Sequence, residues 1–380
     1  MWIFNTIMIL TVVATGFIVG ITPLISRQAT PFGISLPSQY VKDPTVQQYV
    51  KQYAIWIISI SALLILPMLG LPLLFTFEQQ LELILSIYVT VAITLQLILS
   101  FVLYLKYRKA LQQWKQSLPT EAFNQHNRII IDTHYHDKLT AIPFTTFFLA
   151  QFVIWLVTIL LAVLNYDRIH ELIPLNWNLN FEVSRTVEKS WKVVLALPGI
   201  QLLLIPIMQF GYYSFIKSRQ KLSPVAPLIS SEKSRLFREA WARFFFIMAV
   251  LTQLLLSCLY LYSLFIQDSH FGWLMTLTII YLLYSLGGSI YLSLRYGQAG
   301  EKLSLPGDSD EDLAVYQDAE EDAKWIAGLF YFNPDDAAIF VEKRFGIGST
   351  LNMARWQAWV TVLGLIAFLV ITIIWSIMLG

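Results

Sequence analysis

Residues 143–164 read PFTTFFLAQFVIWLVTILLAVL, and none of these 22 side chains is charged. A helix of about 20 apolar residues crosses the hydrocarbon core of a bilayer. Seven more apolar blocks of similar length lie at about 2–24, 53–75, 80–104, 191–215, 243–266, 272–294 and 356–379. Because hydrocarbon offers no hydrogen-bond partner to the backbone, each block is predicted to be a helix.

The composition also indicates a membrane protein. Hydrophobic residues make up 56% of the chain and charged residues 13%, against roughly 25% charged in soluble domains. We therefore predict an all-α membrane protein with about eight transmembrane helices, whose first partner is the lipid bilayer. The net charge of +1 gives no reason to expect a nucleic-acid partner, and the single cysteine, Cys258, excludes an internal disulfide.

Lys and Arg predict the orientation of the chain. Of the 26 basic residues, 22 lie in the alternate segments 25–52, 105–142, 216–243 and 295–355. Loops rich in Lys and Arg face the cytoplasm. Both termini are therefore predicted to lie outside.

The eight blocks contain no Asp, Glu, Lys, Arg or His at depth. Ion-coupled transporters usually need such a group inside the membrane, so its absence argues against one. The polar side chains at depth are amides, which could bond between helices or line a polar path: Gln96, Gln151, Gln201, Gln209 and Gln253. Prolines in "LPMLGLP" (66–72) and "LPGIQLLLIP" (197–206) favour kinked packing helices.

The stretch "LFYFNPDDAAIFVEKRFGIGS" (329–349) lies between the last two blocks and is predicted to be cytoplasmic. "NPDD" is typical of a turn in which the Asn side chain bonds the backbone, and the following residues suggest a small hairpin-like element beneath the last helix. It is either a connector or a site, and Lys343 and Arg344 beside two glycines could bind a phosphate or lipid headgroup. The candidate residues are Tyr331, Asn333, Asp335, Asp336, Lys343, Arg344, Gly346 and Gly348.

Three other inner segments allow simpler interpretations. Asp43 followed by Pro44 is typical of a helix start that runs into the second block. His134 and His136 in "DTHYHDKL" share one face of an extended strand, but too few ligands accompany them for a metal site. The acidic run "DSDEDLAVYQDAEED" (308–322) is typical of a solvated linker. We expect no metal and no cofactor.

The outer loop, residues 165–191, is the one long polar segment predicted to face outside. An external ligand would be met there. The candidate residues are Tyr166, Asp167, Pro174, Asn176, Trp177, Asn178 and Lys189.

This loop resembles a module of bacterial membrane proteins that include immunity proteins of the Sdp killing-factor type. The module reads Tyr-Asp-x-(Leu/Ile)-Pro, then Ile-Pro-x-His-(Phe/Trp)-Asn, and later Lys-Ser before a helix. The matching residues are Tyr166, Asp167, Ile169, Ile173, Pro174, Trp177, Asn178, Lys189 and Ser190. Asn176 stands in place of the histidine, so the titratable group is missing.

Residues 325–352 resemble a second module of unknown function, Trp-x-x-Gly-x-Phe-Tyr-x-Asn-Pro-Asp-Asp followed by Phe-Val-x-Lys-Arg-Phe-Gly-Ile-Gly and Asn. The likeness covers most of the chain. It implies a multi-pass protein of the bacterial plasma membrane, with peptide-toxin immunity in some relatives. A toxin peptide outside and a regulatory protein inside are the partners that this resemblance suggests.

Two functions stay open, and neither is enzymatic because no catalytic motif occurs. The first is immunity to, or sensing of, a membrane-active peptide or envelope stress through the outer loop. The second is transport or export of an uncharged or amphipathic solute. The segments assigned are 1–142 (first three spans), 143–216 (spans four and five with the outer loop), 217–324 (spans six and seven) and 325–380 (inner motif and last span).

Overall fold

The computed structural model of the 380-residue chain describes residues 2–74, 78–119, 139–177, 183–220, 222–223, 226–266, 272–306 and 322–378. Within these residues, eight helices are long and apolar enough to cross a membrane. They are α1 (Trp2–Ile25), α3 (Pro44–Leu74), α4 (Glu78–Gln116), α6 (Phe144–Leu164), α7 (Trp191–Lys217), α8 (Pro227–Phe265), α9 (Gly272–Tyr296) and α11 (Trp356–Met378). The predicted class, an all-α membrane protein of eight spans, is confirmed.

Several helices extend well beyond the apolar blocks. The helix α3 begins at Pro44, and the Asp43 carboxylate accepts a hydrogen bond from the Thr45 N–H at 2.8 Å, as predicted for a helix start. The helix α4 continues to Gln116 and α8 begins at Pro227. Charged residues end an apolar block without ending the helix, because the extended turns still bury one apolar face, with Leu111 of α4 and Phe237 of α8 buried.

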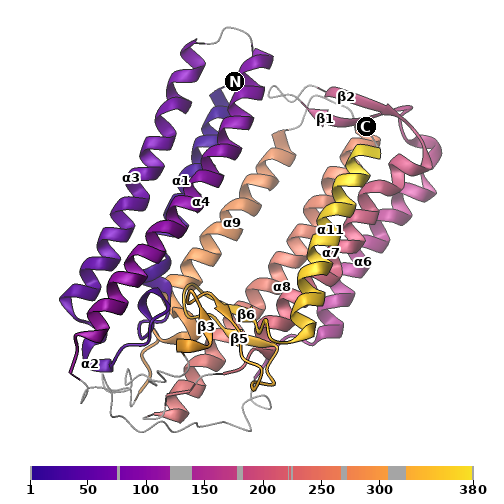
Figure 1. Cartoon of the computed structure of the whole chain (residues 1–380). Helices are drawn as coiled ribbons and strands as arrows, with labels where there is room; N and C mark the ends of the chain where they lie inside the picture. Colours follow the sequence, from indigo (N-terminus) through magenta and orange to yellow (C-terminus); the bar gives the residue numbers. More distant parts are fainter. Residues whose placement is uncertain are drawn as a thin grey trace.

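The spans form two groups that lie side by side (Figure 1). The N-terminal bundle consists of α1, α3 and α4, and the second bundle consists of α6, α7 and α8. The helix α9 packs on α8 and touches α1, while α11 contacts α7. The four-segment division of the sequence stays an interpretation, and α8 packs with α6 and α7 of the preceding segment.

Proline does not interrupt α3 or α7. Pro198 lacks the N–H that would bond the Val194 carbonyl, and the Tyr260 hydroxyl of α8 donates to that carbonyl at 2.6 Å. In α3, Pro72 likewise leaves the Met68 carbonyl free, and the Asn5 side chain of α1 donates to it at 2.9 Å. At these two positions a neighbouring helix thus supplies the donor that the proline removes.

Small antiparallel hairpins lie at both ends of the molecule. At one end β1 (Leu172–Trp177) pairs with β2 (Val183–Glu188), with Leu172 opposite Glu188. Near the other end β3 (Trp325–Ile326) pairs with β4 (Phe330–Tyr331), and β5 (Phe340–Glu342) pairs with β6 (Ser349–Leu351). The extended element predicted before the last helix is confirmed, whereas the β1–β2 hairpin was not predicted.

Short elements complete the connections. They are α2 (Ser38–Val41) and the 3-10 turns η1 (Pro31–Gly33), η3 (Tyr166–Arg168) and η4 (Gln298–Gly300). The His134–His136 pair and residues 308–321 of the acidic run lie outside the described residues.

The helix α1 begins, and α11 ends, at the end of the molecule that carries β1 and β2 (Figure 1). The start of α1 and the end of α11 thus lie at the same end of the molecule (Figure 1), as the prediction that both termini share one side requires. That this side is the outside stays a prediction from the positive charges.

Cysteine labelling tests that orientation. In a Cys258→Ala background, the substitution Glu171→Cys should react with a membrane-impermeant maleimide on intact cells, because the Glu171 side chain is 85% exposed near β1. Ser304→Cys, an exposed position after α9, should react only after permeabilisation. The reverse pattern of labelling would invert the topology.

Candidate functional site

Residues 322–355 lie between the two bundles, at the end of the molecule away from β1 and β2 (Figure 1). We call this segment and its contacts the inner junction. It contains all the candidate residues of the 329–349 stretch, so the junction is built upward from that sequence.

The turn between β5 and β6 inserts one apolar side chain into each bundle. Phe345 packs against Phe32 and Tyr104 of the N-terminal bundle, with ring centroids 6.0 and 4.6 Å apart. Ile347, two residues later, packs against the aromatic cluster of the second bundle. The intervening Gly346 has a φ of 86°, a left-handed conformation that favours glycine. The turn therefore joins the bundles.

The backbone of this turn is bonded within the chain. The Gly346 N–H donates to the Ser26 hydroxyl at 2.6 Å, and the Gly348 N–H donates to the Gln298 side-chain oxygen at 2.8 Å. The Arg344 carbonyl accepts from the Thr30 hydroxyl at 3.1 Å. The glycine N–H groups that a bound phosphate would use thus already donate to Ser26, just after α1, and to Gln298 in the turn after α9.

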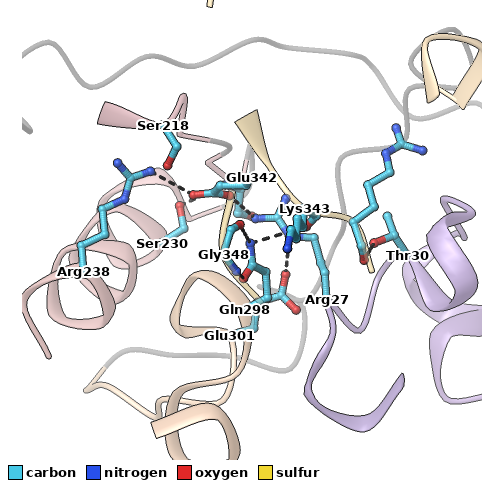
Figure 2. Close-up of polar contacts among 12 residues, drawn as sticks. Arg27, Thr30, Ser218, Ser230, Arg238, Gln298, Glu301, Glu342, Lys343 and Gly348 are labelled. Atoms are coloured by element: carbon cyan, nitrogen blue, oxygen red, sulfur yellow. Dashed lines mark hydrogen bonds and ion pairs between the residues drawn. The ribbon is translucent and has the colours of Figure 1, made fainter. Parts of the chain in front are cut away.

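Glu342 on β5 joins both bundles by charge (Figure 2). Its carboxylate forms two ion pairs. One oxygen lies 2.7 Å from a guanidinium nitrogen of Arg27, just after α1, and the other lies 3.1 Å from one of Arg238 in α8. The three side chains are 7%, 10% and 1% exposed, so the pairs are almost wholly removed from water. Arg27 also meets Glu301 at 2.9 Å, which gives two carboxylates for two guanidinium groups. Burial raises the pKa of Glu301, and the Arg27 charge opposes this rise.

Asp322 forms a second charged cluster at the edge of the junction. It pairs with Arg344 and with Lys115 of α4, whose ammonium lies 2.9 Å away, and it accepts a bond from the Ser35 hydroxyl at 2.7 Å. Burial alone would raise the pKa of Asp322, but the Arg344 and Lys115 charges outweigh it and hold the pKa below its usual range. The Arg344 guanidinium also lies 5.3 Å from the Trp325 ring centroid.

Asn352 organises the folding of the junction itself. Its side chain is fully buried, and its amide nitrogen donates to the carbonyls of Asn333, Asp336 and Ala338. Its oxygen accepts from the Asn333 and Ala354 N–H groups. One side chain thus closes the loop between β4 and α11.

The remaining inner candidates surround this hub. The Asn333 oxygen accepts from the Asp335 N–H at 3.1 Å, which confirms the predicted turn at "NPDD". The buried Tyr331 hydroxyl bonds both Asn333 and Asp336, each at 3.0 Å. Asp336 pairs with Arg219 at 2.8 Å, and Asp335 is exposed. Burial is the main cause that raises the pKa of Tyr331 and lowers that of Lys343.

The outer candidates divide into an anchored group and an exposed group. Tyr166 stacks on Trp191 with centroids 4.0 Å apart, and the Lys189 ammonium lies 5.3 Å from the Tyr166 ring centroid. Lys189 also donates to the Ile169 carbonyl at 3.1 Å. Asp167 is exposed. These contacts hold the two ends of the outer loop together.

The hairpin holds the other outer candidates. Pro174 is buried opposite Thr186, and the backbones of Asn176 and Trp177 pair with Arg185 and Val183. Asn178 lies outside the described residues. Inner and outer candidates therefore form two sites at opposite ends of the molecule.

The sequence interpretation missed the central residues of the junction. Arg27, Arg238, Glu301 and Glu342 were not singled out, and Asp322 was read as part of a solvated linker. The sequence shows only a charged residue near the end of an apolar helix. Such a residue can face water or form a buried ion pair, and the two cases cannot be told apart until its partner is known. Within the described part of the chain, no group of three or more His, Cys, Asp or Glu could hold a metal.

Comparison with protein-family models gives a match within the C-terminal part of the chain. Residues 334–359 match the model of a family of unknown function, DUF5808. This range runs from the turn at Pro334 through the Asn352 hub into α11. No curated protein and no solved structure matches. The chain is thus a multi-pass membrane protein with a segment similar to a family of unknown function.

Glu342→Gln should destabilise the protein strongly. Removing one partner of a buried ion pair costs about 3–5 kcal/mol, because the other charge stays buried. The measurement is the unfolding free energy in mild detergent. Glu171→Gln, which breaks an exposed pair with Lys189, should change it little. Equal effects of the two substitutions would contradict a structural role for Glu342.

Asp322 should make the junction acid-sensitive. A carboxylate with a lowered pKa stabilises the fold above its unfolded pKa of about 3.9, and this contribution disappears as the pH falls through the folded value. The thermal midpoint should therefore drop in acid, and Asp322→Asn should be less stable at pH 7 with a flatter profile below pH 5. Parallel profiles would exclude Asp322 as the titrating group.

Proposed function

We propose that this chain is a non-enzymatic protein of the bacterial plasma membrane that senses or neutralises a membrane-active peptide at residues 165–191. The inner junction then receives the change of state, and a regulatory protein could read it there. The observation that carries this proposal is the connection of both sites by one helix, α8.

The outer hairpin is seated on the outer end of α8. Ile169 and Ile173 are buried with Tyr260 and Leu264 of that helix, and β1 contacts α8. At its other end, α8 carries Arg238, which pairs with Glu342. The 22 residues from Arg238 to Tyr260 correspond to about 33 Å of helix. A displacement of the hairpin would therefore act on a rigid element that ends in the junction.

The hairpin has one edge suited to an extended peptide. The Lys189 N–H donates to the Glu171 carbonyl at 2.8 Å. Because bonded and non-bonded pairs alternate in an antiparallel ladder, Thr186 and Glu188 direct their backbone groups away from β1. The free edge of β1 is less suited to pairing with a peptide, because Pro174 has no N–H to donate and β1 lies against α8. A peptide could add a strand beside β2, with affinity from main-chain hydrogen bonds.

The test is survival of host cells challenged with pore-forming and envelope-active peptides from neighbouring strains. Cells that lack the gene should be hypersensitive to one peptide, and the intact gene should rescue them. Variants Pro174→Ala, Trp177→Ala and Asn178→Ala should reach the membrane yet fail to protect. Normal protection by all three would remove the outer loop from the proposal.

A matched pair of substitutions tests recognition by the β2 edge. Thr186→Pro removes the outward N–H without touching the bonds between β1 and β2, and should abolish protection. Thr186→Val keeps that N–H and should protect normally. Equal protection by both variants would contradict strand addition and leave side-chain recognition as the mechanism.

Transport of an uncharged or amphipathic solute is the second candidate. It is favoured by the buried amides of the second bundle, where Gln151 and Gln201 are completely buried. Uptake or export that depends on these two amides would support it. Flat traces for a broad panel of solutes in membrane vesicles would exclude it.

A further inference from the structure

The core of the second bundle contains a cluster of polar, non-ionisable side chains contributed by all three helices. Each is buried, and none is more than 6% exposed. The members are Thr158 of α6, Gln201 of α7, and Gln253 and Ser257 of α8, and Gln151 is a further buried amide of α6. Hydrogen bonds between such side chains are common at contacts of membrane helices, so the informative feature is which of their polar atoms stay unbonded.

Two of the amides are bonded reciprocally across the α7–α8 contact. The Gln201 side-chain nitrogen donates to the backbone carbonyl of Gln253 at 3.3 Å and to the Ser257 hydroxyl at 3.2 Å. In return, the Gln253 side-chain nitrogen donates to the backbone carbonyl of Gln201 at 3.3 Å. Thr158 joins the cluster through a 2.6 Å bond to Ser257. The amide nitrogens and hydroxyls are therefore engaged.

The orientation of the amides follows from these contacts. Each nitrogen faces a backbone carbonyl, and the Gln151 nitrogen faces that of Phe147 at 3.1 Å. A carbonyl only accepts, so rotating any of these amides would place oxygen against oxygen. The side-chain oxygens of Gln151, Gln201 and Gln253 are thereby directed elsewhere. All three are buried and meet no hydrogen-bond donor in the described part of the chain.

These oxygens define the chemistry of what binds there. Each needs a donor, and hydrocarbon supplies none. A cation would meet acceptors only, with no carboxylate in the cluster to balance its charge inside the membrane. A neutral molecule with more than one donor satisfies the acceptors without that charge. Water has two donors and commonly bonds about three buried polar groups in proteins.

We propose that the α6–α7–α8 core is an internal water site in which bound water donates to the amide oxygens of Gln201 and Gln253. This inference is independent of the peptide proposed for the outer loop. It gives the second bundle a hydrated centre at the depth where the sequence contains no Asp, Glu, Lys, Arg or His.

Water-edited solid-state NMR tests the site directly. The full chain, labelled with ¹³C and ¹⁵N, is placed in bilayers of deuterated lipid, and magnetisation transfer from water is followed with time. The side-chain amides of Gln201 and Gln253 should gain signal several-fold faster than the methyl groups of Leu202. Leu202 is a matched control, because it neighbours Gln201 on α7 yet is 38% exposed on the outside of the bundle.

The variants Gln201→Met and Gln253→Met assign the two amide signals, each by the loss of one resonance. Wild-type protein supplies the decisive comparison, so the test does not depend on how stable the variants are. Build-up at Gln201 and Gln253 as slow as at Leu202 would overturn the proposal. Fast build-up confined to Gln209, nearer the inner end of α7, would overturn it as well, since water would then stop at the surface.

Discussion

A single carboxylate, that of Glu342, constrains how the two bundles are placed. It is almost fully buried, and its partners come from different bundles: Arg27 lies just after α1, and Arg238 lies in α8. A charge removed from water must keep its partner, because an unpaired one is strongly unfavourable in that environment. The N-terminal bundle, the second bundle and β5 therefore have to meet at one point. The Phe345 and Ile347 contacts then add apolar packing on the two sides of that point.

The same requirement for partners explains the polar side chains within the spans. Backbone groups in hydrocarbon must be bonded inside the protein, and each proline removes one donor. Asn5 and Tyr260 lie where Pro72 and Pro198 leave carbonyls free. These side chains fix one helix against its neighbour at a defined height. At these two prolines, the freed carbonyl thus becomes a contact between α3 and α1 or between α7 and α8.

The sequence predicts the spans and the inner extended element because both follow from local patterns. A block of 20 apolar residues indicates a helix wherever it lies, and "NPDD" specifies a turn among neighbours. The junction could not be predicted in this way. Arg238 and Glu342 are 104 residues apart, and each alone is typical of a solvated surface. Asn352 bonds segments 14 to 19 residues away, and amide side chains give no sequence signal for that role.

The outer hairpin could not be predicted either, because its local pattern is weak and its packing partner lies far along the chain. In "LIPLNW" and "VSRTVE" the alternation of apolar and polar residues is weak, and the burial of Ile173 depends on α8, nearly 90 residues further along the chain.

The arrangement of α8 limits the ways in which the two ends of the molecule could communicate. Its outer end is packed under the hairpin, its middle bears Gln253 and Ser257, and its inner end is held by Glu342. A buried ion pair resists gradual stretching, because partial separation already exposes uncompensated charge in a poorly solvated site. While the pair stays closed, motion of α8 would therefore move β5 with it.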